Sequence, residues 1–116
     1  MNAPEQYELF TLAEGQSKVE FEEDSRIQFA GTFTINLEDH TVGNILRMQL
    51  LQDDRVRFAG YKAPHPLEHK VQVKVQTNGQ ITPHQAVMES LQSLSQTFKQ
   101  LQSQFEKQLK QSLASA

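Results

Sequence analysis

Residues 83–113, the last quarter of the chain, carry an apolar repeat that restricts the fold more than any other feature. The stretch has no glycine, and its single proline, Pro83, stands at the first position, where a helix tolerates proline. Apolar side chains recur at spacings that alternate between four and three residues, at Val87, Leu91, Leu94, Phe98, Leu101 and Phe105. This period of about 3.5 residues predicts one long helix with an apolar seam along one side.

The predicted helix is longer than the domain that would carry it. Thr82 is a good N-cap and Gln85 completes a capping box with it, so we expect the helix to begin there. Its 31 residues would span about 46 Å, whereas a compact chain of about 100 residues is only roughly 34 Å across. The far half of the seam is then uncovered, and soluble monomers avoid such stripes. The sequence therefore predicts a partner helix, and a helix that kinks after Phe98 and folds back is the alternative.

The rest of the chain alternates between strand and helix patterns. The expected elements are strands at 18–22 and 29–37, a helix at 41–52, strands at 56–61 and 70–76, and the long helix at 83–113. This β-β-α-β-β-α order predicts an α+β fold, a four-stranded antiparallel sheet with both helices on one face. We expect a single domain over residues 1–116, in which residues 1–17 form an irregular segment that docks its apolar side chains on another surface.

Alternation within the strands predicts which side chains face the helices. In the second strand the inner positions are Phe29, Gly31, Phe33, Ile35 and Leu37. A glycine on an inner face favours close approach by another group. In the third strand Val56, Phe58 and Gly60 are expected to share a face, and in the fourth Val71, Val73 and Val75 are expected to point inward.

The short helix at 41–52 has an apolar face, and a glycine interrupts it. The apolar positions are Val42, Ile45, Leu46 and Leu50. Asp39 or Thr41 is expected to cap its start. Gly43 costs about 1 kcal/mol relative to alanine inside a helix, so we expect something to press against the helix backbone there.

Composition excludes several classes of function. The chain has no cysteine, which removes disulfides, thiolate metal sites and cysteine catalysis. No apolar run approaches the length of a membrane span, and the acidic first thirty residues have no secretory-signal pattern. Residues 1–40 hold nine acids and two bases, and residues 41–116 hold five acids and nine bases. Neither part is basic enough to predict nucleic-acid binding from its charge alone.

Side chains capable of catalysis or metal binding do not form a recognisable site. His65 and His69 have a helical spacing, but the two prolines around His65 exclude a helix there. His40 lies beside residues that are expected to cap a helix, and His84 is expected on the surface. Arg55, Arg57, Lys70 and Lys74 form a basic strip with little aromatic accompaniment. We therefore expect no catalytic residues, no metal and no cofactor.

Two motifs resemble those of a known family. Residues 38–44 read EDHTVGN, residues 56–67 read VRFAGYKAPHPL, and the chain opens MNAP. These segments are similar to the small α-like subunits of RNA polymerases. That family includes the eleventh subunit of eukaryotic RNA polymerase II, the archaeal L subunit and a paralogue shared by polymerases I and III. Its fold is similar to the amino-terminal domain of the bacterial α subunit. The opening MNAP resembles the polymerase II form.

The resemblance implies a non-catalytic scaffold in the nucleus, one that pairs with the larger α-like, third-largest subunit of RNA polymerase II. The pair would then seat the largest and second-largest subunits, together with small zinc-binding subunits, without direct contact to nucleic acid. Gly43 would let a partner helix approach closely, and Asn44 would bridge polar groups in that contact.

The resemblance places site residues in three groups. The interface helix and its motif comprise Glu38, Asp39, His40, Thr41, Gly43, Asn44, Ile45, Leu46 and Leu50. The long-helix interface comprises the six seam residues from Val87 to Phe105, and the loop motif comprises Phe58, Tyr61, Lys62, His65 and Pro66. The chain departs from the family at Val42, where leucine is usual, and at Gln28-Phe29, where proline and asparagine are common.

Other functions stay open at this point. One is the paralogue of polymerases I and III, and another is a free homodimeric adaptor that pairs through the same seam. No polar residue interrupts the seam between Val87 and Phe105, so its register is weakly specified. A small α+β phosphatase is disfavoured, because the loops lack a glycine-rich phosphate cradle.

Overall fold

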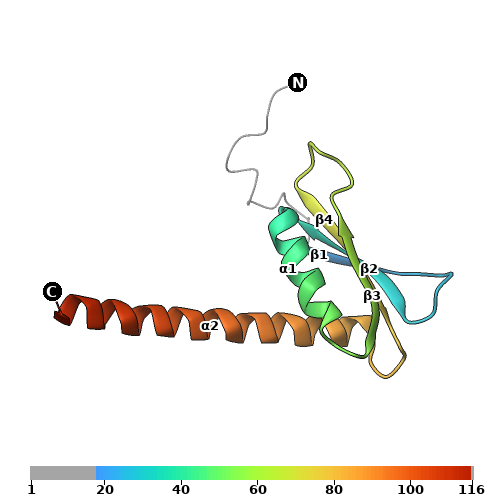
Figure 1. Cartoon of the computed structure of the whole chain (residues 1–116). Coiled ribbons are helices and arrows are strands. Elements are labelled where there is room, and N and C mark those ends of the chain that lie inside the picture. Colours follow the sequence, from blue (N-terminus) through green and yellow to red (C-terminus); the bar gives the residue numbers. More distant parts are fainter. Residues whose placement is uncertain (1–17, 116) are drawn as a thin grey trace.

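A computed structural model describes residues 18–115 and confirms the expected α+β architecture (Figure 1). The elements are β1 (Val19–Glu23), β2 (Ala30–Asn36), α1 (His40–Leu51), β3 (Val56–Lys62), β4 (Lys70–Thr77) and α2 (Pro83–Ser115). The four strands form one antiparallel sheet in the order β1-β2-β4-β3. The predicted docking segment at 1–17 lies outside the described residues.

The last helix is a single straight rod that projects beyond the sheet (Figure 1). It runs for 33 residues without a break, so the alternative in which it kinks after Phe98 and folds back is wrong. The capping box predicted at its start is present. The Gln85 backbone N–H donates to Thr82 Oγ1 at 3.1 Å, and the Thr82 N–H donates to Gln85 Oε1 at 3.1 Å. Neither helix in the described part of the chain is long and apolar enough to cross a membrane.

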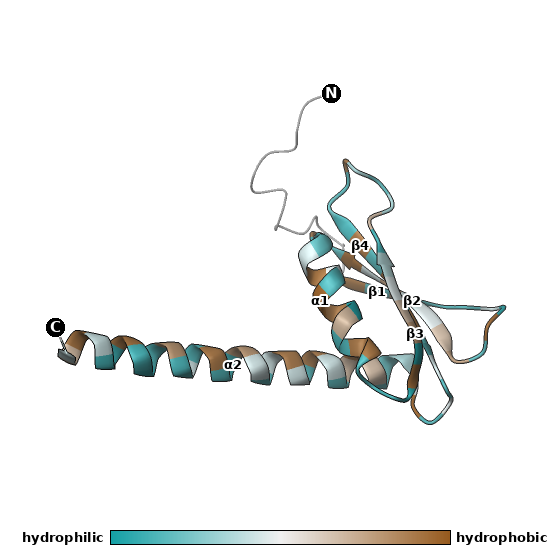
Figure 2. Cartoon of the chain, viewed as in Figure 1, coloured by the Kyte–Doolittle hydropathy of each residue, from teal (hydrophilic) through white to brown (hydrophobic). Residues whose placement is uncertain are grey.

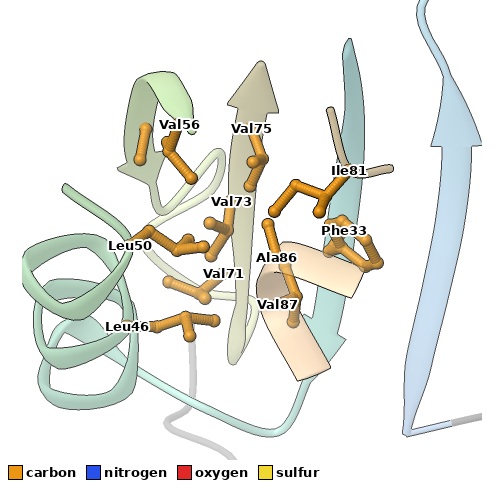
Figure 3. Close-up of a cluster of buried hydrophobic side chains, with 11 residues drawn as sticks. Phe33, Leu46, Leu50, Val56, Val71, Val73, Val75, Ile81, Ala86 and Val87 are labelled. Atoms are coloured by element: carbon orange, nitrogen blue, oxygen red, sulfur yellow. The ribbon is translucent and has the colours of Figure 1, made fainter. Parts of the chain in front are cut away.

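The core lies between the inner face of the sheet, α1 and the first turns of α2 (Figure 3). Strand β4 supplies its centre, because Val71, Val73 and Val75 alternate with polar residues and are fully buried, as predicted. Leu46 and Leu50 of α1 pack on them from one side, and Ala86 and Val87 of α2 from another. This packing fixes both helices on the same face of the sheet.

A β-bulge in β3 overturns one predicted face. Val56 is opposite Thr77 while Phe58 is opposite Gln76, so one extra residue is inserted between them. Because side chains alternate along a strand, the insertion reverses the side on which the later residues lie. Val56 and Ala59 are buried and Phe58 is exposed, so the prediction that Phe58 shares a face with Val56 is wrong.

Strand β2 is shorter than predicted, because Phe29 and Leu37 both have φ near 60°. Such left-handed backbone ends the strand on either side, so these two residues do not continue its inner face. The close approach expected at Gly31 is confirmed, since the Phe21 ring occupies the space that a β-carbon there would take. That ring also packs on Phe33, with centroids 4.7 Å apart.

Candidate subunit interface

The apolar seam of α2 changes from buried to exposed along the helix. Val87 is buried and Leu94 packs partly against the core. From residue 95 to residue 115 every side chain is exposed, including the continuation of the seam at Phe98, Leu101, Phe105, Leu109 and Leu113. Phe105 is 69% exposed. Figure 2 shows these apolar positions as bands that recur along the projecting helix. The uncovered part spans about 31 Å at 1.5 Å per residue.

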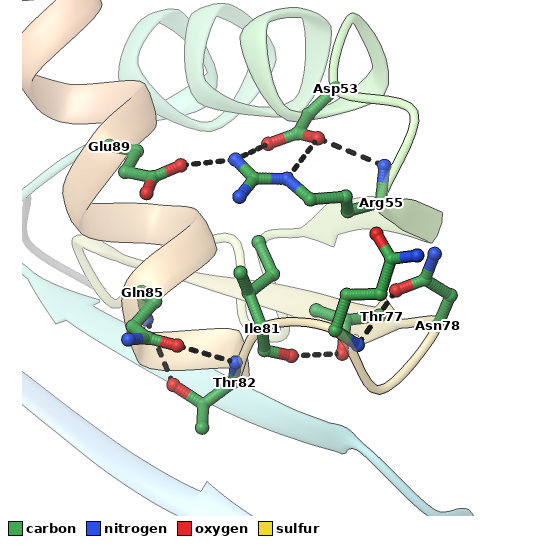
Figure 4. Close-up of polar contacts among 9 residues, drawn as sticks. Asp53, Arg55, Thr77, Asn78, Ile81, Thr82, Gln85 and Glu89 are labelled. Atoms are coloured by element: carbon green, nitrogen blue, oxygen red, sulfur yellow. Dashed lines mark hydrogen bonds and ion pairs between the residues drawn. The ribbon is translucent and has the colours of Figure 1, made fainter.

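Polar contacts hold the first turns of α2 against the domain (Figure 4). Arg55, immediately before β3, donates to Asp53 Oδ2 at 2.9 Å and also contacts Glu89 of α2. The Thr77 hydroxyl donates to the Ile81 carbonyl at 2.6 Å, which secures the loop that enters the helix. The direction in which the exposed seam projects is therefore set by contacts within this chain.

The same ion pairs shift two pKa values. Hydrogen bonds from the Arg55 side chain, and then from its backbone N–H, hold the pKa of Asp53 below its ordinary value. Hydrogen bonds to Asp53 and then Glu89 raise the pKa of Arg55 above its ordinary value. Both shifts favour the charged forms, so the contact between Arg55 and Asp53 is ionic at neutral pH.

The motif at 38–44 forms the start of α1 rather than a reactive site. Asp39 Oδ1 accepts the Thr41 backbone N–H at 2.9 Å, which is an N-cap. His40 Nδ1 lies 3.3 Å from the Tyr61 hydroxyl, and the two rings meet edge to face. Glu38 forms an ion pair with Lys18 at 2.7 Å. These polar residues therefore organise the entry into α1 and its contact with β3.

A contact within this chain explains why residue 43 is a glycine. A β-carbon there would stand 2.6 Å from Tyr61 Cδ2, a distance at which the ring would have to move. The close contact expected at Gly43 is therefore made by a ring from β3, and no partner helix is needed to explain it. Asn44 accepts a hydrogen bond from Arg47 Nη2 at 2.7 Å, also within the chain.

The structure divides the predicted interface residues of α1 into two kinds. Leu46 and Leu50 are 1% and 0% exposed, so they belong to the chain's own core, which corrects their assignment to an interface. Ile45 is half-buried. Met48 and Leu51 are exposed and were not predicted. Their spacing places them off the stripe of Val42, Leu46 and Leu50, a signal that was present in the sequence.

The predicted loop motif is only partly a loop. Phe58, Tyr61 and Lys62 lie on β3, and His65 and Pro66 follow in the exposed segment before β4. The Tyr61 ring faces α1, whereas Phe58 and Lys62 lie on the other face of the sheet. The motif therefore contributes to both faces of the molecule.

The remaining candidates for chemistry are engaged in structural contacts. The exposed His84 packs its ring against Phe21 and Phe33, with centroids 4.2 and 5.2 Å away. Lys70 pairs with Glu68 at 2.9 Å, and Lys74 pairs with Asp24 at 3.4 Å. With Arg55 also paired, the predicted basic strip is largely neutralised. Within residues 18–115 no group of three or more histidine, aspartate or glutamate side chains is placed to hold a metal ion.

Comparisons with known proteins agree with this picture of a helical seam on a small sheet. The profile of the RNA polymerase Rpb3/Rpb11 dimerisation domain matches residues 30–104. The DNA-directed RNA polymerase II subunit rpb11 of Dictyostelium discoideum is 47% identical over 109 residues, 94% of this chain and 91% of that protein. The RNA polymerase II subunit RPB11 of Schizosaccharomyces pombe is 48% identical over 94 residues, 81% of this chain and 76% of that protein.

A solved structure shows the same fold. The crystal structure of RNA polymerase subunit L from Thermoplasma acidophilum superposes with a TM-score of 0.66 at 24% identity, covering 82% of this chain and 93% of that one. The chain belongs to the Rpb3/Rpb11 dimerisation domain family of RNA polymerase subunits. It is a small, non-catalytic subunit of the RNA polymerase II type.

Proposed function

We propose that this chain is an assembly subunit of DNA-directed RNA polymerase II and that it heterodimerises with the larger α-like, third-largest subunit. The observation that carries the proposal is the exposed seam of α2 from Phe98 to Leu113, which the domain itself does not cover. The name of the matching family, Rpb3/Rpb11 dimerisation, supports a partner of this kind.

The energetics favour a protein partner for the seam. Burying an apolar side chain of this size is worth about 1.5–3 kcal/mol, so covering Phe98, Leu101, Phe105, Leu109 and Leu113 is worth roughly 7–15 kcal/mol as an upper value. That gain exceeds the lower estimates of the entropy lost on association. The kind of partner that covers a stripe this long and narrow is a second helix with a comparable apolar seam.

Helix α1 extends the surface available to partners. Met48 and Leu51 are exposed on α1, which lies on the same side of the sheet as α2 (Figure 1). In this proposal the pair seats the largest and second-largest subunits and the small zinc-binding subunits in the nucleus. The neutralised basic strip supports a role without direct contact to nucleic acid.

Two alternatives are weaker. The similarity to polymerase II subunits, at 47% and 48% identity, favours that enzyme over the paralogue shared by polymerases I and III. A free homodimeric adaptor would use the same seam, and the lack of a polar residue between Val87 and Phe105 leaves self-pairing open.

Co-expression with the cognate third-largest subunit, followed by size-exclusion chromatography with light scattering, tests the proposal. We expect a 1:1 heterodimer that persists on dilution, and a lone chain that aggregates or self-associates weakly. A lone chain that forms a stable homodimer and ignores that subunit would refute the proposal in favour of the adaptor.

A further inference from the structure

The outer face of the sheet, on the side away from α1 and α2, carries an arrangement that pairing through the helices does not use (Figure 1). Phe58, Gly60 and Lys62 of β3 are opposite Gln76, Lys74 and Gln72 of β4. Those β4 residues alternate with the buried valines of the core, so their side chains lie on the outer face. Phe58 and Lys62 therefore project away from the helical side of the molecule.

The β3 bulge is what places an aromatic ring on this face. Without the extra residue between Val56 and Phe58, Phe58 would be directed into the core. Instead its side chain is 49% exposed, and the ring lies over Gly60, where a β-carbon would stand 3.0 Å from Phe58 Cζ. Bulges commonly re-aim a side chain in this way. The result is a half-exposed aromatic ring on an otherwise polar face.

The ring forms one wall of a hollow of about 370 Å³, which we call the outer-face hollow. Its other lining residues are Thr32 of β2, Gly60, Tyr61 and Lys62 of β3, and Gln72 and Lys74 of β4. Its wall thus combines one large apolar surface, two ammonium groups, an amide and a hydroxyl. Such a mixture of an apolar wall and a few polar groups is typical of a recognition site.

The charge of the outer-face hollow has one sign. No aspartate or glutamate lines it. Among residues 18–115 Lys62 forms no ion pair, and Lys74 is paired only with Asp24, at 3.4 Å. The hollow is therefore complementary to a carboxylate. Nucleic acid fits it less well, because the neighbouring Lys70 is neutralised by Glu68 and a phosphate backbone requires several cations in a row.

We propose, on the basis of the assembly role proposed above, that the outer-face hollow is a second docking surface, which binds a segment of another polymerase subunit carrying an aspartate or glutamate next to an apolar side chain. The apolar side chain would pack on the Phe58 ring, and the carboxylate would accept a hydrogen bond from the Lys62 ammonium group, which forms no ion pair within residues 18–115. This site lies on the opposite face of the sheet from α2, so it is available in a chain whose seam is already paired. The chain would then join two neighbours through two separate faces.

Photo-crosslinking from position 58 in the intact polymerase tests the proposal. A benzophenone side chain at Phe58 should form a covalent product with a polymerase subunit other than the third-largest one, and the crosslinked peptide should contain an acidic residue. The matched control is the same group at Leu67, which is also about half exposed but lies outside the hollow. Crosslinks to nucleic acid, or to the α-like partner alone, would overturn the proposal. So would a yield of crosslinks to other subunits that is no higher from position 58 than from position 67.

Charge reversal gives an independent readout. Lys62→Glu should lower the recovery of the crosslinked subunit about tenfold, equivalent to roughly 1.4 kcal/mol, with the third-largest subunit still retained at 1:1. Replacing the mapped acidic residue with lysine should restore recovery. Arg57→Glu, on the same strand but outside the hollow, is the matched control. If Lys62→Glu leaves recovery unchanged, the docking proposal fails although the heterodimer proposal stands. Loss of the third-largest subunit alone would show that this partner binds at the hollow, and it would also overturn the docking proposal.

Discussion

The two halves of α2 share one sequence pattern and have opposite surroundings. In residues 83–94 the seam begins in the core, and Pro83, Ala86, Val87 and Ser90 are buried. In residues 95–115 the apolar repeat continues, but every side chain is exposed. The sheet and α1 reach only the first turns, so the pattern that builds the fold in one half offers a binding surface in the other. Apolar periodicity therefore predicts a helix in both halves, but it does not by itself say which partner covers the seam.

The largest effect should come from charged substitutions in the far half of α2, residues 95–115, and it should appear in partner binding. Phe98→Asp with Phe105→Asp places two charges on the exposed seam. We expect pairing with the third-largest subunit to weaken by at least about a thousandfold, roughly 4 kcal/mol, because apolar anchors at a helix seam become charged groups without counter-ions. Equilibrium binding of purified proteins measures this.

The stability of the isolated chain is the control for that double variant. Both residues are exposed, so its free energy of unfolding should stay within about 0.5 kcal/mol of the original value. Pairing that survives the double variant would show that the far half is not the contact surface.

Substitutions in the near half of α2, residues 83–94, should instead lower the stability of the isolated chain. Val87→Ala removes two buried methyl groups and should lower the free energy of unfolding of the isolated chain by about 2 kcal/mol. Leu101→Ala removes a larger group from an exposed position and should leave that free energy almost unchanged. Urea denaturation of both variants gives the comparison directly. Equal losses would mean that the two halves are packed alike, contrary to the structure.

Gly43 shows the difference between a contact inside the chain and one with a partner. Gly43→Ala should lower the free energy of unfolding by about 1 kcal/mol, because displacing the Tyr61 ring costs about 1–3 kcal/mol and the gain in helix propensity offsets about 1 kcal/mol. In a Tyr61→Ala background the same change should become stabilising. The outcome against this prediction is a Gly43→Ala effect that does not depend on Tyr61, together with a lower affinity for the partner. In that case the partner, and not Tyr61, packs against α1 at Gly43.

The sequence predicted the elements of the fold and the existence of the seam, because both follow from local periodicity and capping. The alternation of Val71, Val73 and Val75 and the Thr82 capping box appear in the structure as expected. The bulge before Phe58 was missed, since one inserted residue leaves no compositional mark and reverses a face. Leu46 and Leu50 were assigned to an interface through the family resemblance, and their apolar stripe does not distinguish burial within a chain from burial between chains.

The smallest predicted effect concerns the ion pairs that orient the near half. Hydrogen bonds from Arg55 lower the pKa of Asp53 in the folded chain, so the folded state binds a proton there less readily than the unfolded state, whose pKa is about 3.9. The contribution of Asp53 is therefore present above about pH 4 and is lost as pH falls through the lower, folded-state pKa. Asp53→Asn keeps an oxygen acceptor for the Arg55 N–H and removes the charge. It should lower the free energy of unfolding by about 0.5–1 kcal/mol at pH 7.

That difference should shrink as pH falls through the lowered, folded-state pKa of Asp53, because the carboxyl of the original chain then becomes protonated as well. Asp54→Asn alters an exposed neighbour in the same turn and should leave the free energy of unfolding at pH 7 almost unchanged. A pH-independent loss in Asp53→Asn would mean that Asp53 acts through its shape and hydrogen bonding rather than its charge. In that case Asp53 would orient Arg55 toward Glu89 of α2 through hydrogen bonds, and the charge of Asp53 would not contribute to the position of the near half.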